Sequence, residues 1–389
     1  MKDRFSEADR CFMREAIALA ERARGATKPN PIVGAVLVKN GKILSRGFHR
    51  RAGLPHAEIE ALAPLGMQAK GATLYVTLEP CCHQGRTGPC TETILRSGIR
   101  RVVVGCCDEN PLVSGRGIAI LRRGGLRVEA GCLKDECHRQ NRAFFTWVRS
   151  KRPRVTLKVA ATLDGCIGDR KEKHRQDIAR WITGSAARSE AHALRAEHDA
   201  ILVGIGTVLA DDPRLTVRRP AKLARRSADL LRIVLDSHLQ TPVTSALLRE
   251  RKSKAPLLIA AKPVNVDRGL AARRRKLEAA GAEVWFAPAT QDGRVDLASL
   301  LRMLAGREVQ SLLVEGGSKI HGSFITQGLV DTMAVFLAPR LVGSGVPVVE
   351  GLGLDWRTPA TLGPISIRAV GEDVLLTADV ITRGRRRRP

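Results

Sequence analysis

One histidine, one glutamate and two cysteines have the types and spacing of a zinc site that activates water. His56 and Glu58 stand one residue apart in LPHAEIEAL (54–62), and Cys81 and Cys90 lie in TLEPCCHQGRTGPC (77–90). Zinc prefers tetrahedral nitrogen and sulfur ligands, and a catalytic zinc keeps its fourth position for water. If His56, Cys81 and Cys90 bind the metal, Glu58 stands beside it as an unligated proton acceptor. These residues predict hydrolytic chemistry.

The crowded cysteine segment leaves other ligand sets open. Cys82 could replace Cys81, and His83 could be a fourth ligand that closes the site to water. A purely structural zinc, or thiols packed without metal, would make Glu58 a bystander. The remaining cysteines lack metal spacing and are expected to be packing residues; they are Cys11, Cys106, Cys107, Cys132, Cys137 and Cys166.

The elements that must position these residues alternate between helix and strand. Helices are expected over 6–24, from about 57, near 91–97 and near 115–123, and strands over 32–38, 72–78, 101–108 and 126–131. Asn40-Gly41 predicts a hairpin. Pro80 fixes the backbone before Cys81, and a helix beginning there would present thiolates near its positive end. The pattern predicts a sheet covered on both faces, partly parallel, with one antiparallel hairpin.

A basic, proline-containing stretch near 150 precedes a second series of strands and helices. Strands are expected within 199–213, 230–242, 255–261, 282–288, 311–317, 331–343 and 373–381. We therefore expect two α/β domains, 1–148 and 149–383, followed by a disordered basic tail, 384–389. The strand in SLLVEGGSKIHGS (311–323) ends in a glycine pair before a possible helix, a turn that can expose N–H groups to a phosphate.

The composition restricts the class of partner. The formal net charge is +26, which fits a solvated basic surface, phosphorylated small molecules or nucleic acid. Aromatic residues make up only 3%, with one tyrosine, so platforms for stacking unpaired bases are scarce and nucleic-acid binding is not expected. No apolar run approaches the roughly 20 residues needed to cross a bilayer. Nine irregularly spaced cysteines and the lack of a leader indicate a cytoplasmic protein.

The motifs of the first 150 residues resemble those of the bifunctional riboflavin-biosynthesis deaminase/reductase family. They are TKPNPIVGAV, HAE, TLEPCCHQGRTGPC and DENPLVSGRG (108–117). Zinc nucleobase deaminases share an H-x-E then P-C-x-x-C signature, but eight residues separate Cys81 from Cys90 here, as in the longer loop of this family. The resemblance implies a cytidine-deaminase-like three-layer domain in which His56, Cys81 and Cys90 bind Zn²⁺ and Glu58 carries the proton. It also places Asn30 at the base, and Cys82 stands where the family usually has serine.

The second half resembles the NADPH-dependent reductase domain of the same family, which has a dihydrofolate-reductase-like fold. The matching segments are KVAATLDG (158–165), WITG (181–184), ALRAEHDAILVGIGTVLADDPRLTVR (193–218), VLDSHLQTP (234–242) and LLVEGGSKIHGS (312–323). The residues implied to contact the nucleotide are Ala160, Trp181, Thr207, Asp211, Ser237, Gly317, Ser318, Lys319, Ile320, His321, Gly322 and Ser323. Those implied to hold the phosphoribosyl substrate are Arg195, Leu215, Arg218 and Glu315. The two guanidinium groups suit a phosphate, which they can bind bidentately.

One segment of the reductase half departs from the family pattern. Residues 166–180 replace a short glycine- and serine-containing segment, and Ala179 stands where a serine near the substrate is usual. Substrate contacts there stay open.

The resemblance implies an enzyme with two successive reactions. The first is hydrolytic deamination of 2,5-diamino-6-(ribosylamino)pyrimidin-4-one 5′-phosphate, and the second is NADPH-dependent reduction of the ribosyl group to ribityl. The expected partner is this phosphorylated pyrimidine, with no membrane, and a homo-oligomer is possible. Two rival hypotheses are a tRNA or free-base deaminase with an unrelated C-terminal domain, and a zinc-stabilised nucleic-acid-binding module.

Overall fold

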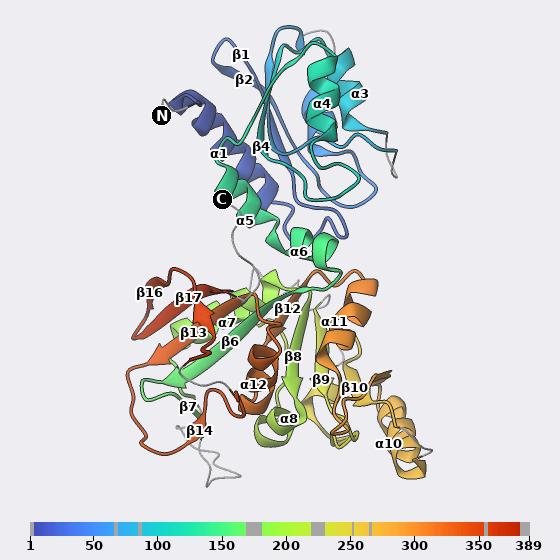
Figure 1. The fold of residues 1–389 in the computed structure, drawn as a ribbon, viewed down its shortest axis with the longest axis vertical. Helices are drawn as coiled ribbons and strands as arrows, with labels where there is room; N and C mark the ends of the chain where they lie inside the picture. The colour runs from blue at the N-terminus through green and yellow to red at the C-terminus, as the bar shows by residue number, and fades with distance from the viewer. Residues whose placement is uncertain are drawn as a thin grey trace. The chain divides into compact units, whose positions relative to one another are not determined.

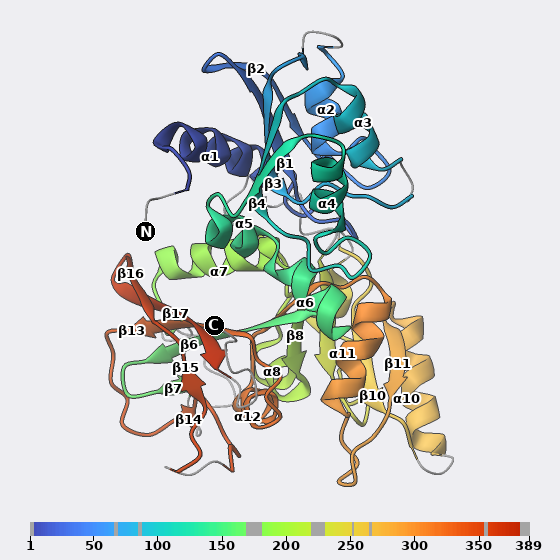
Figure 2. The same ribbon diagram turned by 45° about the horizontal axis from the view of Figure 1, so that its top comes forward.

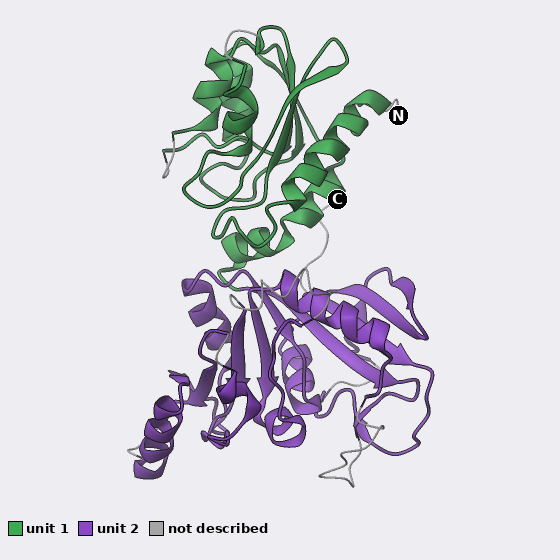
Figure 3. Ribbon diagram, turned by 180° about the vertical axis from the view of Figure 1, so that it is seen from behind, with its two compact units in different colours: residues 1–152 green, residues 153–389 purple. Residues whose placement is uncertain are grey.

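The computed structural model describes residues 4–65, 69–84, 88–168, 181–218, 230–250, 253–263, 267–353 and 357–381. Ala179 and the basic segment 384–389 lie outside these residues. The chain forms two compact units, Met1–Arg152 and Pro153–Pro389 (Figure 3). A search of the described helices finds none with the length and hydropathy required to cross a membrane.

The first unit is built on a mixed sheet with the order β2-β1-β3-β4-β5 (Figure 1). Its strands are β1 Gly34–Lys39, β2 Lys42–Phe48, β3 Thr73–Leu78, β4 Arg101–Cys106 and β5 Arg127–Ala130, and its helices are α1 Glu7–Glu21, α2 Ala57–Leu62, α3 Cys90–Arg96, α4 Arg116–Arg123, α5 Lys134–Gln140 and α6 Arg142–Ser150. Strand β1 pairs antiparallel with β2 and β3, whereas β3, β4 and β5 are parallel. The expected hairpin is confirmed, with positive φ at Asn40 (51°) and Gly41 (71°).

Helices cover both faces of this sheet, so the expected three-layer architecture is confirmed. Alternate residues of β1 point to opposite faces, with Leu37 in the core under α2, α3 and α4 and Val36 in the core under α1, α5 and α6. The two helical layers lie on opposite sides of the strands in both views (Figures 1 and 2). The inner strands β1, β3 and β4 are apolar nearly throughout because both of their faces are buried, whereas the edge strand β2 is polar and partly exposed.

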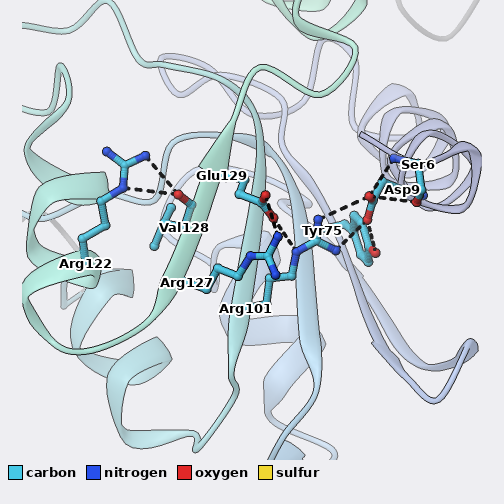
Figure 4. A network of polar contacts seen from close by, with 8 residues as sticks. All are labelled: Ser6, Asp9, Tyr75, Arg101, Arg122, Arg127, Val128 and Glu129. Carbon is cyan, nitrogen blue, oxygen red and sulfur yellow. Dashed lines mark hydrogen bonds and ion pairs between the residues drawn. The ribbon is translucent and has the colours of Figure 1, made fainter. Parts of the chain in front are cut away.

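A charged network anchors α1 to the sheet (Figure 4). Arg101 of β4 lies 2.7 Å from the Asp9 carboxylate of α1 and 2.6 Å from that of Glu129 on β5. Tyr75 of β3 also donates to Asp9, at 2.8 Å, and Ser6 forms a capping box with Asp9. Burial acts to raise the pKa of Asp9, but hydrogen bonds from Arg101, Tyr75 and Ser6 hold it well below its usual range. The Asp9 side chain therefore joins α1 to β3 and β4.

The second unit is built on a longer sheet with the order β11-β10-β9-β8-β12-β6-β13-β17-β15, in which β16 also pairs with β17. Its strands are β6 Arg154–Thr162, β7 Cys166–Gly168, β8 Ala200–Gly204, β9 Leu231–Leu235, β10 Leu257–Ala261, β11 Glu283–Ala287, β12 Ser311–Val314, β13 Thr332–Ala338, β14 Val346–Pro347, β15 Thr361–Leu362, β16 Ser366–Val370 and β17 Asp373–Ile381. Its helices are α7 Ser185–Glu197, α8 Ile205–Asp211, α9 Ala246–Arg249, α10 Arg268–Ala279, α11 Leu297–Gly306 and α12 Ser318–Thr326.

This sheet is parallel from β11 to β13 and antiparallel between β13 and β17. Helices α11 and α12 pack on the core of one face, and α7 to α10 pack on the core of the other. The helix expected after the glycine pair is confirmed as α12, with Gly317 as its N-cap. The carboxyl ends of the parallel strands β6, β8 and β12 therefore meet at one edge, where ligands bind in such sheets.

Candidate functional site

Three ends of secondary-structure elements bring the predicted metal ligands together. His56 is the N-cap of α2, Cys81 follows β3, and Cys90 is the first residue of α3. Their ligand atoms all lie within 4.8 Å of one another. His56 Nδ1 is 3.3 Å from Cys90 Sγ and 3.5 Å from Cys81 Sγ. One nitrogen and two sulfur donors match the three-ligand set of a catalytic zinc.

The helix expected to begin at Cys81 is wrong, since α3 begins nine residues later, at Cys90. The Cys90 N–H donates to Cys81 Sγ at 3.4 Å. Cys81 therefore lies beside the N-terminal end of α3 and not within a helix. Hydrogen bonds from Cys90 and His56 outweigh burial and lower the pKa of Cys81 to about 4. The lowered pKa favours the thiolate of Cys81, which is the form that binds metal.

The two alternative ligands lie outside the cluster, although His83 lines the same cavity as His56 and Cys81. Cys82 Sγ contacts the carbonyl of Leu112 at 3.8 Å, and neither Cys82 nor His83 belongs to the cluster of ligand atoms. A cavity of about 280 Å³ opens beside His56 and Cys81. The donor set thus fits a zinc ion, which these three residues would hold beside this cavity.

Glu58 lies in the first turn of α2 and lines the same cavity with only 3% of its surface exposed. Burial, together with the nearby charge of Cys81, raises the pKa of Glu58 to about 7. A carboxyl group with such a pKa can both accept and release a proton near neutrality.

The cavity also contains polar residues that lie far apart in the sequence. Asn30, His49, Asp108 and Asn110 line it, so the expectation that Asn30 reaches this pocket agrees with its placement. His49 Nδ1 donates to the carbonyl of Pro55 at 3.1 Å, which leaves Nε2 to accept from the Asn30 amide at 3.1 Å. Asp108 and Asn110 begin the DENPLVSGRG segment singled out in the sequence. His49 was missed because it carries no spacing signal.

A second cavity, of about 730 Å³, lies in the second unit and collects most of the predicted reductase residues. Those that line it are Ala160, Trp181, Thr207, Asp211, Gly317, His321, Arg195, Leu215, Arg218 and Glu315. Predicted contacts that are described but do not line it are Ser237, Ser318, Lys319, Ile320, Gly322 and Ser323. Several of these are engaged elsewhere: Ser318 Oγ donates to Glu350, and an added Cβ at Gly322 would meet the Glu350 carbonyl at 1.9 Å.

The Arg195 fork pairs with a carboxylate in this cleft, and its contact with the substrate phosphate stays a prediction. Its Nε and Nη2 donate to the two carboxylate oxygens of Glu315 at 2.6 and 2.7 Å, and Nη1 donates to the Thr216 carbonyl at 3.0 Å. Lys158 Nζ lies 3.9 Å from Glu315. Burial acts to raise the pKa of Glu315, but Arg195 and Lys158 lower it to about 2. Arg195 therefore orients the carboxylate of Glu315, which directly follows β12 and lies next to β6 because the two strands are paired.

Two further residues of this cleft were missed from the sequence. Lys158 was a polar interruption in an apolar strand, which was the one available signal. His192 of α7 lines the cavity and accepts the Arg218 N–H at 3.4 Å. Burial and the charges of Arg195 and Arg218 lower the pKa of His192 to about 4, so its imidazole is neutral at pH 7.

Comparison with known proteins assigns both units. Residues 6–106 match the cytidine and deoxycytidylate deaminase zinc-binding region, which here contains His56, Cys81 and Cys90. Residues 153–376 match the RibD C-terminal domain. The chain is 42% identical over 371 residues to riboflavin biosynthesis protein RibD of Aquifex aeolicus, covering 95% of this chain and 98% of that protein. It is 36% identical over 388 residues to RibD of Escherichia coli, covering 95% and 98%.

Two solved structures are similar over nearly the whole chain. Acinetobacter baumannii RibD, form 1, has a TM-score of 0.81 at 33% identity, covering 97% of this chain and 99% of that one. The diaminohydroxyphosphoribosylaminopyrimidine deaminase/5-amino-6-(5-phosphoribosylamino)uracil reductase of Thermotoga maritima has a TM-score of 0.80 at 34% identity, covering 96% and 99%. This chain therefore belongs to the RibD family of bifunctional deaminase/reductase enzymes of riboflavin biosynthesis.

Proposed function

We propose that the first unit hydrolytically deaminates 2,5-diamino-6-(ribosylamino)pyrimidin-4-one 5′-phosphate, and that the second reduces the ribosyl group of the product to ribityl with NADPH. The activities in the name of the Thermotoga maritima relative support these substrates. The observation that carries the proposal is the cavity that joins the three metal ligands to the buried, unligated Glu58. Both rival hypotheses are wrong, because the chain is an enzyme and its C-terminal half matches the RibD C-terminal domain.

The deaminase step needs an activated water and a proton carrier. A zinc ion held by His56, Cys81 and Cys90 would supply a water of lowered pKa as the nucleophile. Glu58 would hold the proton released by the attacking water and pass it to the amino group that leaves the ring carbon as ammonia. Its pKa of about 7 suits both transfers. Asn30, Asp108 and Asn110 offer hydrogen bonds that orient the pyrimidine.

The second cavity suits two phosphorylated ligands. Cationic side chains outnumber the acidic Asp211, Asp212 and Glu315 in its lining; they are Lys158, Arg188, Arg195, Arg214, Arg218 and Arg249. Opening the ribosyl ring and reducing it adds one hydride from NADPH to the anomeric carbon and one proton to the ring oxygen. The hydride chemistry belongs to the cofactor, and the protein orients it against the sugar.

Arg195 and Arg218 are the proposed ligands of the substrate phosphate, and Arg195 also holds Glu315. Contacts of the nucleotide with Ser237 and with 318–320, 322 and 323 remain predictions, as does a homo-oligomer. None of the nine cysteines forms a disulfide, which accords with the predicted cytoplasmic location.

A coupled assay tests both halves of the proposal. Purified protein is given the diamino substrate with and without NADPH, and ammonia release and NADPH oxidation are followed separately. We expect ammonia in both samples and NADPH oxidation only after deamination. Absence of ammonia would refute the deaminase assignment. Failure to oxidise NADPH with the deaminated substrate would refute the reductase assignment.

A further inference from the structure

Glu79 is a buried carboxylate that neither the metal cluster nor the proton transfer uses. It follows β3, stands two residues before Cys81 and is 3% exposed. Its oxygens accept hydrogen bonds from three backbone N–H groups. Oε2 accepts from Asp108 at 3.2 Å and from Gly115 at 2.9 Å, and Oε1 accepts from Ile118 at 3.2 Å. Such charge-assisted bonds are stronger than bonds between neutral groups.

Two of these donors, Asp108 and Gly115, belong to the segment that connects β4 to α4, and the third, Ile118, lies in the first turn of α4. Gly115 is the N-cap of α4, has a φ of 82° and supplies no side-chain cap. Glu79 satisfies the N–H groups of the N-cap and of Ile118 in the first turn, from a distant part of the chain. A carboxylate is also favoured at a helix N-terminus because of the helix dipole. Glu79 thus replaces the missing local cap.

The same segment carries residues of the metal cavity. Asp108, Asn110 and Val113 line the cavity. Asn110 N–H donates to Asp108 Oδ1 at 2.8 Å, and Leu112 N–H donates to Asn110 Oδ1 at 3.1 Å, so residues 108–112 form a closed turn. A shift of this turn would move both polar side chains together.

Helix α4 also packs directly against the backbone that leads to Cys81. A Cβ at Gly117 would lie 2.1 Å from the Pro80 carbonyl and 3.3 Å from Glu79 Oε1. Only glycine permits this approach. The segment 79–81 therefore carries both the anchor of the 108–115 loop and one ligand of the metal.

We propose that Glu79 is a positioning residue of the deaminase site, whose carboxylate fixes the 108–115 loop relative to Cys81 and so places Asp108 and Asn110 against the pyrimidine. The inference rests on the proposed deaminase function. Glutamine at this position retains the shape but turns an N–H group toward a backbone donor, so one anchor is lost and replaced by repulsion. The loop then meets the substrate in a shifted position, while Glu58 and the metal ligands are unchanged.

The test compares Glu79→Gln with Glu92→Gln, which makes the same chemical change at an exposed glutamate of α3 in the same unit. Zinc content, KM and kcat for deamination, and hydrogen exchange of the backbone amides of Asp108, Gly115 and Ile118 are measured. For Glu79→Gln we expect one zinc per chain, a KM raised about tenfold or more, a smaller change in kcat and faster exchange of the three amides. Reduction of the deaminated substrate should be unchanged, and Glu92→Gln should match the parent throughout.

A folded, zinc-loaded Glu79→Gln enzyme with the parental KM would overturn the proposal, even if its melting temperature fell. If Glu79→Gln does not fold or loses zinc, Gly117→Ala decides, because its added methyl group presses on the same contact and leaves Glu79 intact. A raised KM in that variant supports the proposal, and a parental KM overturns it. A parental enzyme that releases no ammonia would instead refute the proposed function, and amide exchange alone would then test the anchor.

Discussion

At the scale of single residues, burial decides what the carboxylates of the two cavities can do. Glu58 has no cationic partner strong enough to offset its burial, and its pKa rises to about 7. Glu315 is also buried, but Arg195 and Lys158 bring its pKa down to about 2. The first carboxyl group can exchange protons near neutrality, whereas the second stays ionised and serves as a fixed charge. Each residue leads to a different test.

Glu58→Gln should retain zinc and lose deamination by about a hundredfold or more, the usual contribution of general acid–base catalysis. The amide keeps the shape of the side chain but cannot carry the proton. Metal analysis and ammonia release measure the two effects, and NADPH-dependent reduction of the deaminated substrate serves as the control in the same sample. Full deaminase activity in this variant would show that Glu58 does not transfer the proton.

Glu315 should make the stability of the second unit depend on acid. Its folded pKa lies below the value of 4.5 for an ordinary glutamate, so its stabilising contribution is complete above about pH 4.5 and is lost as the pH falls toward 2. The difference in free energy of unfolding between the parent and Glu315→Gln should therefore narrow as the pH falls from 6 to 3. Chemical denaturation at several pH values measures it. A difference in free energy of unfolding that stays constant over this pH range would contradict the lowered pKa of Glu315.

At the scale of elements, α1 depends on charge as well as on its apolar face. Met13, Ala16 and Leu19 bury that face, and the Asp9–Arg101–Glu129 network holds the end of the helix on β4 and β5 (Figure 4). A long-range ion pair of this kind leaves buried charge behind when one partner is removed.

Arg101→Met should destabilise the first unit by about 2 to 4 kcal/mol, because Asp9 and Glu129 would lose their shared cation. Arg96→Met is the matched control, since Arg96 is exposed on α3 and lies 3.7 Å from Glu92. It should change stability by less than about 0.5 kcal/mol. Thermal unfolding of the two variants makes the comparison, and equal melting temperatures would argue against the anchoring role of Arg101.

At the scale of the whole molecule, each unit has its own apolar core and its own site. The core residues under both faces of the first sheet come from between Met13 and Val148, and those of the second unit come from between Val155 and Leu375. Metal binding and nucleotide binding should therefore stabilise different parts of the chain, since a ligand stabilises only the structure that binds it.

Calorimetry should show this separation. Removing zinc with a chelator should lower one unfolding transition and leave the other in place, and adding NADP⁺ should raise only the second. Restoring zinc should return the first transition to its original temperature. A single transition that moves with both ligands would mean that the two units unfold together.

The sequence alone identified the metal ligands, the placement of Glu58 beside them and most of the helices and strands. Zinc chemistry restricts ligand types strongly, so His56, Cys81 and Cys90 were recognisable from type and spacing. Apolar periodicity and the Asn40-Gly41 turn likewise report local structure, which is why the hairpin and the alternating elements were predictable. The helix expected near 91–97 is confirmed as α3, whereas the helix expected to begin at Cys81 is wrong, because a proline before Cys81 is compatible with either a helix or an irregular end.

Only the tertiary structure decided which distant polar groups meet. Arg195 and Glu315 are separated by 120 positions, and their pairing depends on β12 lying between β6 and β8. Glu79 and His49 carry no spacing signal, and their roles depend on hydrogen bonds to backbone and side-chain groups that the fold brings within reach. Local patterns encode the elements and the metal chemistry, whereas contacts between elements arise only when the sheets assemble and bury them.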